Sequence, residues 1–145
     1  LTLALLEGLL VRVGRGFYVI PLTQIHKFSL WADRPEKPVA SLPLPRLHLA
    51  EWFGVARGGE GNQVGVELES DKGPLLILVD EILGKREIVL KGLNPLMGCL
   101  KGVNGGAILG DGRVALVLDI PYLVRDFSRS ILESGVMRPA AKALG

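Results

Sequence analysis

The sequence predicts an all-β protein of the barrel or sandwich type. Short apolar runs recur about every 8 to 12 residues, turn residues separate them, and only two segments have a helical pattern. The apolar runs are residues 2–6, 9–13, 17–20, 26–31, 39–44, 63–69, 75–79, 85–90, 103–109 and 113–118. A chain of 145 residues fits one domain. We assign residues 1–134 to this domain and expect residues 135–145 to form a flexible tail.

Glycine marks most of the predicted turns, because it adopts positive φ without steric cost. We predict turns at residues 7–8, 14–16 and 71–73. The Asp111-Gly112 pair lies between two apolar runs and predicts a type I′ hairpin, since both residue types tolerate left-handed dihedrals. Gly110, Asp111 and Gly112 are therefore interpreted as structural turn residues.

Two short segments have helical character. Residues 46–53 place several apolar side chains on one face, with Pro45 before them and Gly54 as a stop. Residues 120–132 follow Asp119, a suitable N-cap, and carry Pro121 in their first turn. The sequence therefore predicts one short helix within the chain and one longer helix near its end.

A weak internal repeat runs through the sequence. Residues 18–25 resemble residues 76–83, since each is an apolar strand that ends in Pro or Asp and turns into a kinked segment. Residues 42–47 and 117–123 form a second similar pair in the same order. Two pairs in one order indicate two related small barrels built from one chain.

Composition excludes several classes of protein. Seventeen Lys and Arg balance fifteen Asp and Glu, and aromatic content is 6%, which disfavours a nucleic-acid partner. The longest apolar stretches, residues 75–79 and 114–118, fall far short of the ~20 residues that a spanning helix needs. The single cysteine, Cys99, suits a reducing compartment. Because the chain begins at Leu1, we expect it to be a piece of a longer protein.

No catalytic arrangement emerges from the sequence. His26, His48 and Cys99 have no metal-site spacing, and no serine lies in a nucleophile elbow. The acidic residues Asp80, Glu81 and Asp119 end apolar strands, where a capping role is favoured over acid–base chemistry. We therefore predict a protein without enzymatic activity, cofactor or metal.

Three segments of the second half closely resemble the CheW-like domain of bacterial chemotaxis. They are Leu-Val-Asp-Glu-Ile-Leu-Gly at residues 78–84, Glu-Ile-Val-Leu-Lys at residues 87–91, and the stretch at residues 102–119 that contains Gly-Asp-Gly-Arg. Residues 1–14 are similar to the start of the regulatory domain at the C-terminus of the histidine kinase CheA. The resemblance covers about residues 1–132.

The resemblance implies a fold of two intertwined five-stranded SH3-like barrels, related by a pseudo-twofold and separated by an apolar seam. It also implies a non-catalytic scaffold that couples chemoreceptors to the kinase. The expected partners are the CheW adaptor or the CheA kinase and the cytoplasmic tips of chemoreceptors. We expect no nucleic acid and no direct membrane insertion. The expected location is the cytoplasm, at membrane-associated receptor arrays.

The sequence departs from the family pattern before the first helix. An Arg-Gly turn is usual there, whereas residues 38–45 carry only the Leu42-Pro43 part of the pattern. This difference bears on the partner contacts of the first barrel.

Scaffold domains bind through exposed apolar patches, so strand-end residues are the candidates for partner contact. Core packing is the competing interpretation for each of them. The partner-binding candidates are Leu42, Leu44, Ile82, Ile88, Leu90, Val103 and Ile108. Two alternative functions remain open, a free-standing CheW-type adaptor and, more remotely, an SH3-like module that binds nucleic acid.

Overall fold

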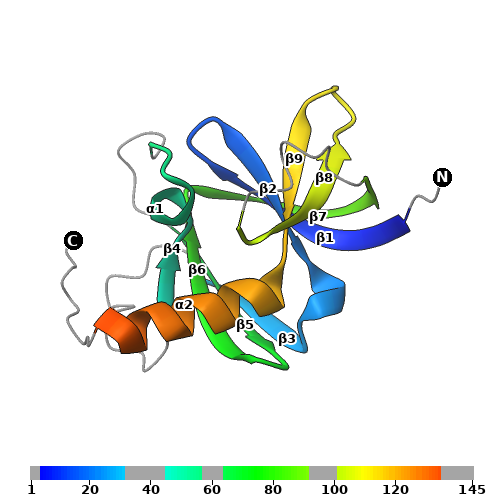
Figure 1. The fold of residues 1–145 in the computed structure, drawn as a ribbon. Coiled ribbons are helices and arrows are strands. Elements are labelled where there is room, and N and C mark those ends of the chain that lie inside the picture. Colours follow the sequence, from blue (N-terminus) through cyan, green and yellow to red (C-terminus); the bar gives the residue numbers. More distant parts are fainter. Residues whose placement is uncertain (1–3, 32–44, 57–63, 92–100, 135–145) are drawn as a thin grey trace.

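A computed structural model describes residues 4–31, 45–56, 64–91 and 101–134 (Figure 1). Strands dominate these residues, as predicted. The strands are β1 (Ala4–Val13), β2 (Gly16–Pro21), β3 (Lys27–Trp31), β4 (Arg46–His48), β5 (Val64–Ser70), β6 (Gly73–Val79), β7 (Glu81–Leu90), β8 (Val103–Ile108) and β9 (Val114–Leu118). The helices are η1 (Leu22–Gln24), α1 (Leu49–Phe53) and α2 (Ile120–Ser134).

The described strands form two sheets, one of five strands in the order β7-β1-β2-β9-β8 and one of four in the order β3-β5-β6-β4. Both sheets follow the same pattern. An antiparallel hairpin, β1–β2 or β5–β6, has a parallel neighbour on one side and an antiparallel neighbour on the other. The predicted internal repeat therefore corresponds to a repeated strand arrangement.

The two halves of the chain exchange strands. The five-stranded sheet takes its hairpin from the first half of the chain and β7, β8 and β9 from the second half. The four-stranded sheet takes its hairpin from the second half and β3 and β4 from the first. In this pattern β8 is the fifth strand of the larger sheet. The stretch of the first half that corresponds to β8 in the repeat includes the predicted strand at residues 39–44, and it lies outside the described residues.

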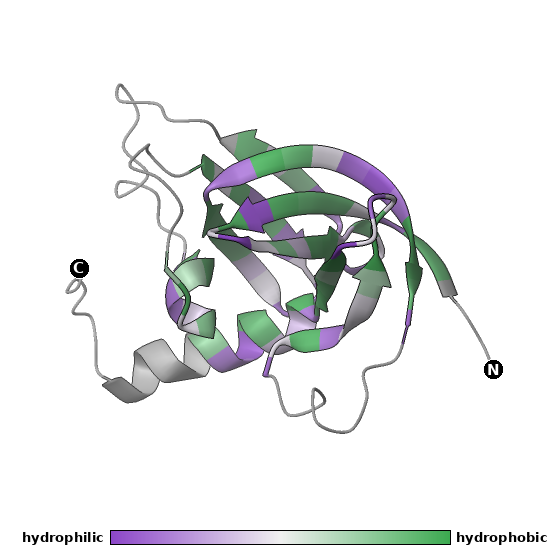
Figure 2. Cartoon of the chain, turned by 90° about the horizontal axis from the view of Figure 1, so that it is seen from above, coloured by the Kyte–Doolittle hydropathy of each residue, from purple (hydrophilic) through white to green (hydrophobic). Residues whose placement is uncertain are grey.

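The main core lies between the two sheets. Alternate residues in the second part of β1 face it, namely Leu9, Val11 and Val13, and β6 contributes Leu75, Ile77 and Val79 in the same way. Helix α2 adds Ile120 and Leu123 to this core. Leu10 and Val19 point the other way and pack in a second core inside the five-stranded sheet. Strands buried on both faces explain the nearly continuous apolar runs, which Figure 2 shows as apolar bands along the strands.

The chain changes sheets between β6 and β7, and a carboxylate holds this crossing in place. Asp80 accepts a hydrogen bond from the Gly14 backbone N–H at 2.7 Å, and its own N–H donates to the Arg12 carbonyl at 3.0 Å. The Arg12 guanidinium pairs with Glu81 at 3.0 Å. Asp80 therefore caps the turn between β1 and β2. It does not cap a helix, because the residues after it continue as β7.

Two local predictions are wrong. Residues 7–8 form no turn, because β1 runs unbroken from Ala4 to Val13. Gly8 instead allows a close approach, since a Cβ there would lie 2.3 Å from Cγ1 of Val19. Residues 46–48 pair with β6 as strand β4, so that the helix begins only at Leu49. Pairing with a central strand overrides the helical pattern at this point.

The two helix boundaries that depend on capping are confirmed. Gly54 ends α1 with φ of 68°. Asp119 Oδ1 accepts the Tyr122 N–H at 3.2 Å at the start of α2. Gln24, which lies outside α2, accepts a second hydrogen bond at the start of this helix: its Oε1 accepts the Ile120 N–H at 3.0 Å. Helix α2 extends two residues beyond its predicted end.

The hairpin between β8 and β9 forms as predicted, but its turn type differs. Only Gly112 has positive φ, at 91°, so the turn is not type I′. The Leu109 N–H donates to the Arg113 carbonyl at 2.7 Å, and the Gly112 N–H donates to the Leu109 carbonyl at 2.9 Å. The loop therefore holds three residues, the second most common hairpin class, with glycine at its left-handed position.

This loop offers a matched pair of glycines. A Cβ at Gly110 or at Gly112 would meet no atom within 4 Å, and only Gly112 has positive φ. Gly112→Val should therefore lower the free energy of unfolding by ~1 kcal/mol or more, whereas Gly110→Val should change it by less than ~0.5 kcal/mol. Urea unfolding of both variants measures the difference. Equal effects of the two substitutions would contradict the assigned dihedrals.

Candidate protein-interaction surface

The five-stranded sheet curls until its two outer strands meet. Just after β7, Lys91 and Gly106 of β8 exchange two backbone hydrogen bonds, at 2.8 Å and 2.9 Å. This contact closes the sheet into a barrel at one end. Ile88, Ala107 and Ala115 fill the interior of this barrel. The residues between and beside them in the sequence must point outward, because side chains alternate along a strand.

Four outward residues are large and apolar. We call Leu5, Val89, Ile108 and Val114 the apolar row; their side chains are 64%, 39%, 56% and 56% exposed. Leu5 lies opposite Val89 on β1 and β7, and Ile108 lies opposite Val114 on β8 and β9. The isolated Lys91–Gly106 bridge joins β7 to β8, two residues from Val89 and two residues from Ile108. The row therefore crosses four neighbouring strands.

The row is unusual for this molecule. Among the described residues, the other exposed large apolar side chains are Leu30 on β3 and Val55 after α1. Single exposed apolar residues are ordinary on a protein surface, whereas a contiguous group indicates a contact surface. The row holds four of the six exposed large apolar side chains among the described residues.

The hairpin tip beside the row is held by Arg113. Its Nε donates to Asp111 Oδ2 at 2.6 Å and its backbone N–H donates to Oδ1 of the same carboxylate at 3.0 Å. The guanidinium also lies over the Phe17 ring, 4.2 Å from the ring centroid. These hydrogen bonds from Arg113 hold the pKa of Asp111 below its ordinary value.

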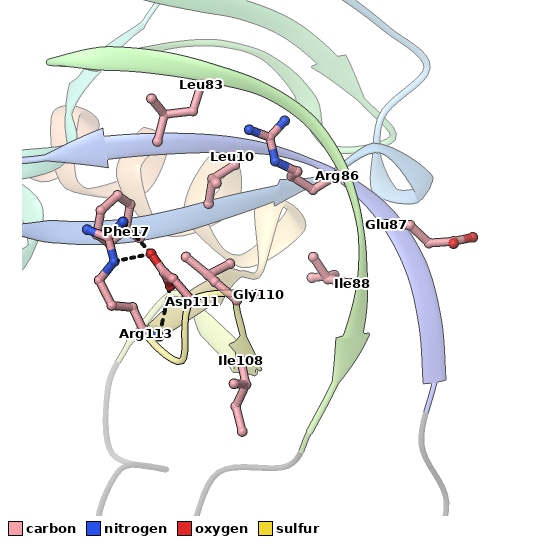
Figure 3. Close-up of a pocket in the computed structure, with 11 residues that line it drawn as sticks. Leu10, Phe17, Leu83, Arg86, Glu87, Ile88, Ile108, Gly110, Asp111 and Arg113 are labelled. Atoms are coloured by element: carbon pink, nitrogen blue, oxygen red, sulfur yellow. Dashed lines mark hydrogen bonds and ion pairs between the residues drawn. The ribbon is translucent and has the colours of Figure 1, made fainter.

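A hollow of about 310 Å³ opens between β7 and the hairpin tip (Figure 3). The apolar residues Leu10, Phe17, Leu83 and Ile88 line its inner wall. A bulge explains the presence of Leu83: in the pairing of β1 with β7, Leu10 faces Gly84 while Val11 faces Ile82, so Leu83 is the extra residue. It turns into the barrel, while Ile82 packs against the main core.

The structure places the predicted contact residues in different environments. Ile108 lies in the apolar row, whereas Ile88 is only 5% exposed and packs in the barrel core, as the competing interpretation of core packing expects. Ile82, Leu90 and Val103 are half-buried. Leu42 and Leu44 lie outside the described residues. Gly110, Asp111 and Gly112 form the loop at the hairpin tip.

Sequence reasoning missed Leu5, Val89 and Val114. A usable signal was present for Val114, because an Asp-Gly hairpin places the residues before and after its loop on one face. Leu5 and Val89 required the pairing of β1 with β7, which joins segments far apart in the chain.

The described residues contain no group of three or more His, Cys, Asp or Glu side chains placed to hold a metal ion. His26 approaches Asp71 at 2.6 Å on the exposed end of the β5–β6 hairpin. Cys99 lies outside the described residues. Within the same residues, no helix is both long and apolar enough to cross a membrane.

Comparison with known proteins identifies the family. Residues 7–128 match the CheW-like domain, so the chain belongs to that family. The chemotaxis protein CheA of Rhizobium meliloti is 32% identical over 136 residues, covering 86% of this chain and 18% of that protein. CheA of Salmonella typhimurium is 30% identical over 134 residues, covering 85% of this chain and 20% of that protein. The chain thus spans about a fifth of the length of these curated relatives.

A solved structure confirms the fold. The scaffolding protein TtCheW from Thermoanaerobacter tengcongensis superposes with a TM-score of 0.59. The match covers 83% of this chain and 92% of that protein, at 14% sequence identity. The two-sheet fold is therefore shared across a large divergence in sequence.

The Asp111–Arg113 pair predicts a measurable titration. Because Asp111 has a lowered pKa in the folded protein, the loop contact is fully formed above the ordinary carboxyl pKa and is lost as the pH falls through the lowered value. Carboxyl NMR titration of the protein should give a pKa for Asp111 below 3.8. Arg113→Gln should raise that pKa, and an unchanged value would exclude Arg113 as the cause.

Proposed function

We propose that this chain is the regulatory scaffold domain of a chemotaxis histidine kinase, and that it couples chemoreceptors to the kinase by binding a CheW adaptor and the receptor tips. The apolar row is the observation that carries this proposal. It presents four exposed apolar side chains on strands of one sheet, whose outer strands are joined by a backbone bridge at one end. Rigid apolar anchors lose little conformational entropy on binding, which favours protein–protein contact.

The relatives support the kinase assignment over a free adaptor. Proteins named CheA match this chain at 30% and 32% identity over most of its length. The likeness to the scaffolding protein TtCheW, at 14% identity, supports a common fold. A free-standing adaptor is the second candidate, because that match covers 92% of TtCheW. Under either assignment we propose that the domain acts in the cytoplasm at receptor arrays, with a partner domain bound on the row.

Charge supports a protein partner over a nucleic acid. The net charge is +2, and the arginine at the hairpin tip is already paired with Asp111. A phosphate backbone is bound by clustered, uncompensated Lys and Arg. The surroundings of the row instead fit the usual anatomy of a protein interface, an apolar centre with a polar rim.

Substitution in the apolar row tests the proposal. Ile108→Asp and Val114→Asp should each weaken binding of a CheW adaptor about tenfold or more, because each buries a carboxylate without a partner in the complex. Calorimetric titration measures the dissociation constant, and near-UV circular dichroism checks that each variant is folded.

Two further variants serve as controls. Leu30→Asp changes an exposed apolar residue of the four-stranded sheet and should leave adaptor affinity unchanged. Ile88→Asp puts a charge in the barrel core and should unfold the domain. Full adaptor affinity in both row variants would contradict the proposed interface.

A further inference from the structure

Among the described residues, no strand pairs with the outer edge of β7 along most of its length. On its inner side, β7 pairs with β1 from Leu90 to Glu81. On its outer side, the described residues provide only the bridge between Lys91 and Gly106, just beyond the strand end. An open edge presents a row of backbone donors and acceptors that another extended segment can pair with.

The hollow lies directly beside this open edge. Leu83 and Ile88 of β7 line it together with Leu10 and Phe17 from the barrel interior. The hairpin tip at residues 109–113 forms its opposite wall. An added strand on the β7 edge would therefore have every second side chain directed at an apolar wall.

Arg86 supplies a charge at the mouth of the hollow. In Figure 3 its side chain projects from β7 on the same side as Leu83, whereas Glu87 points away. Its Nη1 donates to the Lys85 carbonyl at 2.9 Å. Asp111 on the opposite wall is engaged by Arg113, with Nη2 and Nε both on Oδ2. Of the described carboxylates, none forms an ion pair with Arg86, so its charge is available to a ligand.

We propose that this edge and hollow form a docking site for an extended peptide segment of a partner protein, one that carries an apolar side chain two residues away from an acidic one. The segment adds as a strand to the outer edge of β7. Its apolar side chain enters the hollow, and its carboxylate pairs with Arg86. The spacing of two residues follows from strand geometry, which directs both side chains to one face. Strand addition with pockets for alternate side chains is an established mode of peptide recognition.

This site is distinct from the apolar row and does not depend on the proposed function. The row lies on the outside of the barrel, whereas the hollow opens into its interior. Only Ile108 contributes to both. Val114→Asp should therefore weaken adaptor binding and leave peptide binding intact.

Fluorescence anisotropy with a labelled synthetic peptide tests the site on the full 145-residue chain. The probe is acetyl-Thr-Thr-Leu-Thr-Asp-Thr-amide, and a second probe has Lys in place of Asp. We expect the Asp probe to bind about tenfold or more tightly than the Lys probe. Arg86→Glu should reverse this order, while Lys85→Glu, one residue away on the strand, should preserve it. No binding of either probe, equal binding of both, or an unchanged order in Arg86→Glu would overturn the proposal.

A second measurement separates strand addition from insertion of a side chain alone. The Asp probe is made with N-methyl groups on alternate amides, in both registers. One register should lose binding about tenfold or more, because the methyl groups remove the donors that face β7. Amides of residues 83–88 should also gain protection from hydrogen exchange when the unmodified probe binds. Equal binding of all three probes, or no added protection, would overturn strand addition.

Discussion

The parallel pairing of β2 with β9 and of β6 with β4 is the constraint on which the fold depends. A parallel pair cannot be made by a tight hairpin and needs a long connection. The connection from β2 to β9 passes through the other sheet before it returns, and the connection from β4 to β6 runs through α1 and β5. The two sheets are therefore tied together, and the core between them is built jointly by strands from both halves of the chain. The barrel that carries the apolar row forms only when β7, β8 and β9 of the second half pair beside the β1–β2 hairpin of the first half.

The sequence predicted much of this architecture for identifiable reasons. Short apolar runs separated by turn residues located β2, β5, β6, β8 and β9, and the Asp119 cap located α2. Local patterns failed where a distant partner decided the outcome. Residues 46–48 became a strand because β6 lies beside them, and Gly8 continues a strand because Val19 leaves no room for a side chain. Neither neighbour is visible in a local window of sequence.

The interaction surface was harder to predict than the fold. Ile88 and Val89 are adjacent β-branched residues, and sequence alone does not tell which of them faces the barrel interior. The register with β1 settles this, and it places Ile88 in the core and Val89 on the surface. A one-residue error in register exchanges all inward and outward positions of a strand. Ile108 was chosen as a strand-end residue, and the hairpin loop next to it fixes its register locally.

Strand exchange also has a consequence for how the domain reaches its native state. Ala4 pairs with Leu90, and the Phe17–Ala115 pair joins residues even further apart in the sequence. Neither barrel can form until such distant segments meet, so much of the chain entropy is lost before the ladders stabilise the product. Folding is expected to be slow and cooperative, without an independently stable half. Neither half of the chain contains all the strands of one sheet, so each half lacks the neighbours that its own strands need.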